Sequence, residues 1–181
     1  MIDNIVITFA GLIGSGKSTV SVALAEALGC SRASFGDYVR DVAKKRGLKP
    51  EREELQAIGN ELIERGWEPF CKAVLSQANW KKGNTIVVDG IRHIEAIQTL
   101  LKITNPSRFI LVFISIGDED RKARLAGKGI NEKQQQIKID SHSTEMQVSS
   151  IKQKADIILD GTKAIPALVD QVIKYIFFPS K

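Results

Sequence analysis

The octapeptide GLIGSGKS at residues 11–18 combines glycines, a lysine and a serine at a spacing that suits phosphate binding. Glycine has no Cβ, so consecutive backbone N–H groups can turn inward around phosphate oxygens, and a following helix adds its positive end. In the pattern G-x-x-x-x-G-K-[ST], Lys17 reaches the β- and γ-phosphates and the Ser18 hydroxyl ligates Mg²⁺. The pattern predicts a site for a nucleotide and Mg²⁺, whose nucleotide contacts come from Gly11, Ile13, Gly14, Ser15, Gly16, Lys17, Ser18 and Thr19.

Two carboxylates and two arginines follow strand-like runs further along the chain. In SFGDYVR, Asp37 and Arg40 lie one helical turn apart on the same face, and a guanidinium is suited to bidentate phosphate capture. Asp89 ends the run TIVVD, expected beside the first strand, where a carboxylate can hold Mg²⁺ or its water shell. Arg92 follows three residues later. From the residues alone, an alternative remains in which Arg40 and Arg92 are solvent-exposed charges near helix starts and bind no phosphate.

The elements that must position these side chains alternate along the chain. Nearly continuous apolar runs predict strands that are covered on both faces, at 4–10, 84–89, 108–116 and 155–160, and 31–35 is a shorter candidate strand. Helix-like stretches separate them, several closed by glycine, at 18–29, 36–47, 51–66, 67–83, 93–102, 118–127, 141–154 and 165–178. This alternation predicts an α/β fold with a parallel sheet and helices on both faces.

Composition narrows the class of protein but not its partner. The chain has 181 residues, 43% of them hydrophobic, which suits one domain. Its net charge of +5 suits an anionic partner. Its first residues lack the positive charge of a signal peptide, and no stretch approaches the roughly 20 apolar residues of a membrane span. We therefore expect a soluble cytoplasmic protein without membrane contact, in which Cys30 and Cys71 are reduced, mostly buried thiols.

Three stretches resemble the P-loop nucleoside monophosphate kinase family, which includes the adenylate kinases and archaeal and phage nucleotide kinases. SFGDYVR is similar to the family's G-D-x-x-R. VVDGIRH is similar to D-G-[FY]-P-R, although the proline is absent and Arg92 comes one residue early. RKARLAGKG is similar to the lid motif R-[IL]-x-G-R, with Lys128 at the place of an arginine.

The resemblance implies a role for each matching residue. Arg40 and Arg92 would bind the acceptor phosphate, Asp37 would lie near the transferring group, and Arg124 would contact adenine or a phosphate. Lys128 would close from the lid as a point charge rather than a fork. Missing lid arginines leave further candidates for this work, namely Arg121, Lys133, Lys138 and His142. The run EREELQ resembles an acceptor flap in which Arg52 and Gln56 line the base pocket.

The implied fold is a three-layer P-loop NTPase fold with a five-stranded parallel sheet, a helical acceptor flap and a short lid. We expect a single domain over 1–181, with its core at 1–35, 83–117 and 154–181, the flap at 36–82 and the lid at 118–153.

The predicted activity is transfer of phosphate from Mg²⁺-ATP to a small anionic acceptor, foremost a nucleoside or deoxynucleoside monophosphate. A hydroxyl acceptor, as in dephospho-coenzyme A kinase, remains an alternative, with Asp37 as the proton acceptor. A nucleotide-dependent regulator or RNA-associated ATPase is the other alternative. Nucleic acid is the less favoured partner because no stripe of aromatic and basic residues is present. The sequence leaves the oligomeric state open.

Overall fold

A computed structural model describes residues 4–127 and 142–178, with only the backbone at 142–146. Five strands form one parallel sheet in the order β2-β3-β1-β4-β5. They are β1 (Ile5–Gly11), β2 (Ser31–Ser34), β3 (Ile86–Ile91), β4 (Arg108–Ser115) and β5 (Ile157–Asp160). All five predicted strands are present, and the predicted five-stranded P-loop fold with helices on both faces is confirmed.

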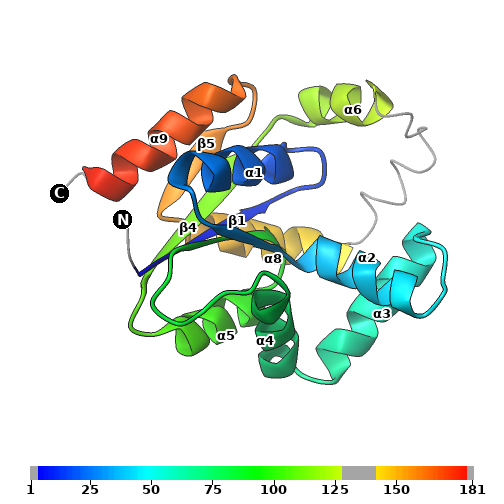
Figure 1. The fold of residues 1–181 in the computed structure, drawn as a ribbon. Coiled ribbons are helices and arrows are strands. Elements are labelled where there is room, and N and C mark those ends of the chain that lie inside the picture. The colour runs from blue at the N-terminus through cyan, green and yellow to red at the C-terminus, as the bar shows by residue number, and fades with distance from the viewer. Residues whose placement is uncertain (1–3, 128–141, 179–181) are drawn as a thin grey trace.

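One or more helices follow each strand along the chain, as Figure 1 shows. They are α1 (Lys17–Leu28), α2 (Phe35–Lys45), α3 (Arg52–Glu64), α4 (Trp67–Gln77), α5 (Ile94–Thr104), α6 (Asp118–Gly127), α8 (His142–Gln153) and α9 (Ile165–Phe177). Among these described helices, none is both long and apolar enough to cross a membrane.

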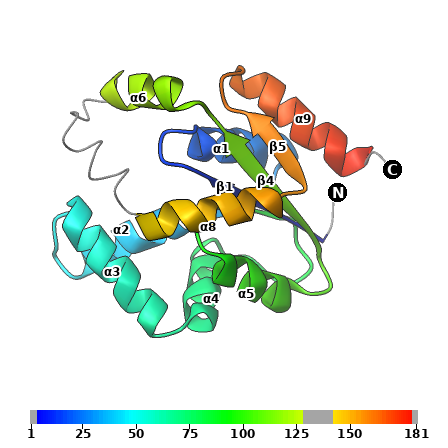
Figure 2. The ribbon, with the colours of Figure 1, turned by 180° about the vertical axis from the view of Figure 1, so that it is seen from behind.

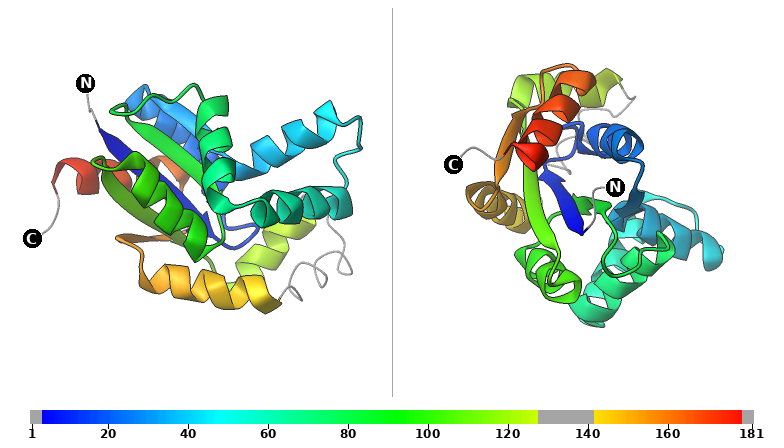
Figure 3. Two further views of the ribbon diagram at one scale, coloured as in Figure 1. Left: turned by 90° about the horizontal axis from the view of Figure 1, so that it is seen from below. Right: turned by 60° about the vertical axis from the view of Figure 1, so that its left-hand side comes forward.

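The two faces of the sheet carry separate hydrophobic clusters, because successive side chains of a strand point to opposite faces. On one face, β1 contributes Val6 and Ala10 to a cluster shared with α4, α5 and α8. On the other face, Ile7 and Phe9 pack with α1 and α9. Figures 2 and 3 show these two helical layers on either side of the strands. Every residue of β1 is therefore buried, which explains its continuous apolar sequence.

The strand order places β1 between β3 and β4. Strands β2 and β3 lie on one side of β1 and β4 and β5 on the other, so the strand order reverses its direction next to β1. In open α/β sheets, ligands bind at the carboxyl ends of the strands at such a switch point. The phosphate loop follows β1 at this edge, and β3 carries Asp89 to it. An extra residue, Gly90, interrupts the pairing of β1 with β3 and adopts a φ of 89°. This bulge bends the end of β3 just before Arg92.

The segment from α2 to α4 extends from the sheet and is attached to its core by aromatic side chains. Phe70 packs edge-to-face on Phe35 at 5.1 Å between ring centroids, and Trp67 stacks on Phe70. Trp67, Phe70 and Trp80 all join the cluster that β1 shares with α4, α5 and α8, because α4 packs directly on α5 and β2. Further out, two hydrogen bonds between Arg46 and Glu61 join α2 to α3.

One predicted helix ends earlier than expected. The pattern extended it to Gly83, but α4 stops at Gln77. Asn79 adopts the left-handed conformation with a φ of 53°, and the Trp80 N–H donates to the carbonyl of Leu75 at 3.1 Å. This hydrogen bond ends a helix in the way that usually involves a glycine in the left-handed conformation. After glycine, asparagine is the residue that tolerates this conformation best.

Candidate active site

The phosphate loop has the backbone shape that its glycines predict. Gly14 and Gly16 have φ values of 86° and 93°, a region that L side chains rarely adopt. The Ser15 N–H donates to the Leu12 carbonyl at 3.2 Å, which closes the turn. A Cβ on Gly14 would lie 3.2 Å from the side chains of Arg121 and Leu125, so the glycine also lets α6 pack against the loop.

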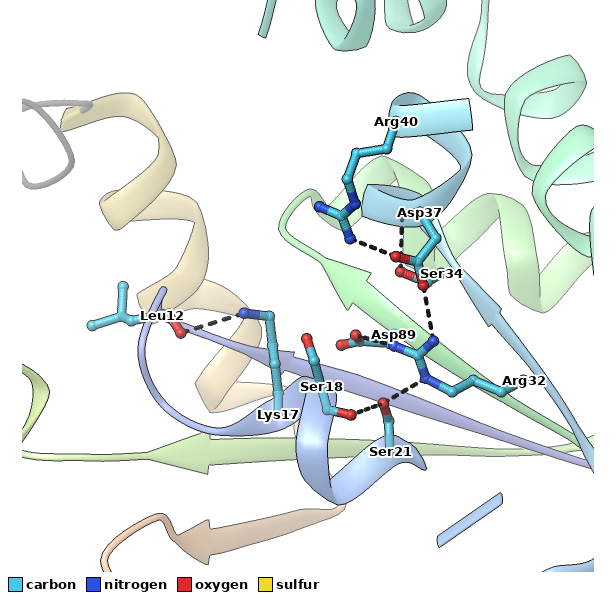
Figure 4. Close-up of polar contacts among 9 residues, drawn as sticks. All are labelled: Leu12, Lys17, Ser18, Ser21, Arg32, Ser34, Asp37, Arg40 and Asp89. Atoms are coloured by element: carbon cyan, nitrogen blue, oxygen red, sulfur yellow. Dashed lines mark hydrogen bonds and ion pairs between the residues drawn. The ribbon is translucent and has the colours of Figure 1, made fainter. Parts of the chain in front are cut away.

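Helix α1 begins at Lys17 directly after the loop, and no described side chain caps its first turn. Its first N–H groups and its dipole are therefore directed at the space where phosphates would bind. Lys17 is 7% exposed as a residue, and its side-chain amino group donates to the Leu12 carbonyl at 3.4 Å (Figure 4). Ser18 and Thr19 are exposed beside it.

The carboxylates that the sequence singled out are joined by an arginine that it missed. Arg32 on β2 donates through Nη2 to Asp89 Oδ2 at 2.8 Å and through Nη1 to Asp37 Oδ2 at 2.9 Å. Its Nε donates to Ser21 Oγ at 2.9 Å. Figure 4 shows this guanidinium between the end of β3, the start of α2 and the first turns of α1.

The two carboxylates differ in their environment. The Asp89 side chain is 3% exposed, whereas that of Asp37 is 49% exposed. Partial burial alone would raise the pKa of Asp37, but hydrogen bonds and positive charge from Arg40 and Arg32 outweigh it and hold that pKa below its ordinary value. Ser34 Oγ accepts a hydrogen bond from the Asp37 N–H, so the carboxylate is also fixed at the start of α2.

The predicted acceptor residues lie on three elements. Arg40 donates to Asp37 Oδ1 from the next turn of α2, and its side chain is 55% exposed. Arg92 is half-buried just past β3. Burial lowers the pKa of Arg92 from its ordinary value, Asp89 opposes this shift, and the positive charge of Arg52 adds to it. Arg52 at the start of α3 is therefore close enough to act on Arg92, while Gln56 is exposed one turn further along α3.

Arg124 on α6 joins the phosphate loop to the turn that follows β5. Its Nη1 donates to the Ser15 carbonyl at 3.3 Å and its Nη2 to the Gly161 carbonyl at 2.6 Å. A Cβ on Gly161 would lie 3.0 Å from the Ser15 carbonyl oxygen, so a larger residue would push the two backbone segments apart by a few tenths of an ångström. Arg121 is buried one turn earlier and pairs with Asp118 at 3.1 Å.

Four predicted lid positions cannot be placed. Lys128, Lys133 and Lys138 lie outside the described residues. His142 begins α8, but its side chain is outside the described part of the chain.

Two buried oxygens at this site fit a bound Mg²⁺-nucleotide. Within residues 4–127 and 142–178, neither Asp89 Oδ1 nor Ser15 Oγ has a hydrogen-bond partner, although both are buried. The same residues contain no cluster of three His, Cys, Asp or Glu side chains that could hold a metal. Mg²⁺ prefers one or two carboxylates together with phosphates and waters to a cage of protein ligands. Asp89 and the Ser18 hydroxyl match that donor set.

Arg32 could have been found from the sequence by one signal. It is a charged residue within SRASF, a short strand whose other members are small or apolar. A charge in a covered strand needs a partner. The sequence does not say which carboxylate is the partner of Arg32. That depends on the pairing of β2 with β3, whose register sets Ser34 beside Asp89.

Together, the parallel sheet, the phosphate loop at its switch point and the facing arginines define a P-loop kinase-type domain. A family model described as AAA domain matches residues 7–148. A UPF0200 protein of Pyrobaculum aerophilum is 30% identical over 174 residues, which cover 93% of this chain and 95% of the relative. The chain belongs to this AAA domain family and to the UPF0200 proteins.

Two further similarities concern kinases. A cytidylate kinase of Natronomonas pharaonis is 48% identical over 59 residues, which cover 33% of this chain and 31% of the relative. The crystal structure of shikimate kinase from Aquifex aeolicus covers 95% of this chain and 96% of its own, with a TM-score of 0.56 and 23% identity. The second similarity concerns the fold, and both agree with the predicted resemblance to the P-loop kinases.

Proposed function

We propose that this chain transfers phosphate from Mg²⁺-ATP to a nucleoside or deoxynucleoside monophosphate. The observation that carries the proposal is the set of arginines beyond the phosphate loop. Arg40 is half-exposed on the second turn of α2, and Arg92 and Arg52 are close enough for their charges to interact. Like charges brought together in this way favour an anionic ligand between them.

The proposed roles follow from what phosphoryl transfer requires. The reaction needs alignment and charge stabilisation rather than covalent help from the protein. Lys17 and the loop N–H groups would hold the donor phosphates, and Arg124 would border the adenine side. Mg²⁺, held by Ser18 and Asp89, would neutralise charge on the phosphates. Arg40, Arg92, Arg52 and Gln56 would bind the acceptor, with residues 36–82 as its flap. Residues 118–153 would form the lid, with Lys128 in it.

The state of Asp37 favours a phosphate acceptor over a hydroxyl. Both oxygens of Asp37 accept hydrogen bonds from arginines, and its pKa is held below its ordinary value. Such a carboxylate binds a proton weakly, and a general base works best with a pKa near the operating pH. A monophosphate is already ionised and needs no base.

A hydroxyl acceptor remains the second candidate, and one observation favours it. The Asp37 side chain is half-exposed at the carboxyl edge of the sheet, within the same network as Asp89. A hydroxyl placed there could donate its proton to this carboxylate, the role that the sequence resemblance implies for Asp37 if the acceptor is a hydroxyl.

Release of ADP in the presence of Mg²⁺-ATP tests these candidates. The acceptors are nucleoside and deoxynucleoside monophosphates, dephospho-coenzyme A, shikimate and RNA, each compared with no acceptor. We expect a monophosphate to raise turnover by orders of magnitude above hydrolysis. The Lys17→Ala protein, purified in the same way, controls for contaminating kinases. Stimulation by dephospho-coenzyme A or shikimate alone would favour the second candidate, and stimulation by RNA alone would favour a nucleic-acid-associated ATPase. If no acceptor stimulates turnover, the kinase proposal fails.

A further inference from the structure

We propose that Arg32 is a positioning residue that holds Asp89 in the orientation needed to meet the Mg²⁺ of bound Mg²⁺-ATP. The inference rests on the proposed function, because it concerns the same nucleotide site. The sequence resemblance assigns no role to this arginine.

The first argument is the geometry of the guanidinium. Its three nitrogens donate to three different elements, namely Ser21 on α1, Asp37 on α2 and Asp89 on β3, at 2.8–2.9 Å. A planar guanidinium fixes the relative directions of its donors, so these contacts fix the three acceptors relative to one another. The Arg32 side chain is only 20% exposed, and such burial restricts its rotamers.

The second argument is that the two carboxylate oxygens of Asp89 differ in their partners. Arg32 binds Oδ2, while Oδ1 is buried and has no partner among the described residues. An unpartnered carboxylate oxygen in a buried place is costly unless a ligand uses it. Because Arg32 holds one oxygen, it determines where the other one points. Metal ligands in proteins are commonly oriented by outer partners in this manner.

The third argument is the connection to the other proposed metal ligand. Ser21 Oγ accepts from Arg32 Nε and donates to the carbonyl of Ser18 at 2.8 Å. The same arginine is thereby linked to the first turn of α1, where the Ser18 hydroxyl lies. Figure 4 shows this chain of contacts from Asp89 through Arg32 and Ser21 to Ser18. Arg32 therefore sets Asp89 relative to Ser18.

The test is the Arg32→Lys variant, which keeps the charge but removes the fork. Isothermal titration calorimetry gives the Kd for ATP in EDTA and the Kd for ATP in saturating Mg²⁺. The ratio of the Kd in EDTA to the Kd in Mg²⁺ measures how much the metal strengthens ATP binding. No phosphate transfer is needed. For Arg32→Lys we expect this ratio to fall about tenfold, the lower end for loss of a partner that orients a metal ligand. The Kd in EDTA should stay within about twofold, because a positioning residue acts through the metal.

Two further variants make the result interpretable. Arg108→Lys is the matched control, since Arg108 donates to the carbonyls of Ile176 and Tyr175 from the first residue of β4, at the opposite edge of the sheet. It should leave both Kd values unchanged. Ser21→Ala removes one contact of Arg32 without changing a charge, and it should lower the ratio in the same direction by about twofold to threefold. It keeps the inference testable if Arg32→Lys does not fold.

Each outcome decides the matter. A ratio that is unchanged in folded Arg32→Lys and Ser21→Ala, or that equals one in the unaltered protein, overturns the inference while leaving ATP binding intact. A ratio that rises also overturns it, because Arg32 would then compete with Mg²⁺ for Asp89. If the unaltered protein binds no ATP in either buffer, the proposed function itself fails.

Discussion

Replacing Asp89 by asparagine should destabilise the protein far more than the same change at Asp37, although one arginine binds both carboxylates. The ion pair of Asp89 with Arg32 is 2.8 Å long, and its acidic partner is 3% exposed. The pair of Asp37 with the same arginine is 2.9 Å long, but its acidic partner is 49% exposed. Water can take over the contacts of Asp37 and cannot take over those of Asp89.

The expected size follows from these environments. Asp89→Asn turns an ion pair into a hydrogen bond between a cation and a neutral amide, a loss of about 1–2 kcal/mol, and it buries an amide with an uncompensated donor, which adds about 1 kcal/mol. The loss stays below the 3–5 kcal/mol typical of a broken buried pair, because Arg32 keeps Asp37 as a partner. Asp37→Asn should cost at most about 1 kcal/mol, as exposed pairs do.

Urea unfolding in EDTA without nucleotide measures both variants free of any ligand. We expect the free energy of unfolding to fall by about 2–3 kcal/mol for Asp89→Asn, and Tm to fall by roughly 4–12 °C in a chain of this length. If Asp37→Asn costs as much as Asp89→Asn, or if Asp89→Asn is neutral, burial does not decide the strength of these pairs and the reasoning is refuted.

The remaining predictions concern the reaction, acid stability and thiol chemistry. Lys17→Ala should lower kcat about 10³-fold with Tm nearly unchanged, and an unaltered kcat would remove Lys17 from the reaction. Arg40→Ala should raise the KM for the acceptor about 10-fold or more with little change in the KM for ATP, whereas equal effects on both would place Arg40 outside the acceptor site. The stability that separates the unaltered protein from Asp37→Asn should be present above about pH 4 and shrink as the pH falls further, because the pKa of Asp37 is lower in the folded than in the unfolded state. A difference that grows at lower pH would contradict that shift. Burial raises the pKa of the Cys71 thiol to about 12, so at pH 8 about one part in 10⁴ is thiolate. In a Cys30→Ser background, a thiol reagent should therefore label Cys71 only as fast as the protein unfolds, and rapid labelling of the native protein would show that this thiol is accessible.

Local patterns in the sequence were sufficient for the elements and for the position and backbone shape of the glycine-rich loop after β1. Buried parallel strands need apolar residues on both faces, so four of the strands stood out as nearly continuous apolar runs, whereas β2 offered only the shorter stretch SRASF. A phosphate loop needs glycines, a lysine and a serine within eight consecutive residues, so GLIGSGKS was visible as a unit. The end of α4 escaped this reasoning, because Asn79 supplied a left-handed residue before the glycine that the pattern expected.

Only the tertiary structure decided how the charges at the carboxyl edge pair. Arg32 and Asp89 are 57 residues apart, and they meet because β2 and β3 are neighbours in a register that sets Ser34 beside Asp89. Arg124 is likewise brought to Ser15 and Gly161 by the packing of α6 over the phosphate loop. Residue types and local spacing determined which side chains could do chemistry. Which carboxylate each arginine binds depended on strand register and helix packing, since electrostatic contacts act over a few ångströms in space whatever the separation along the chain.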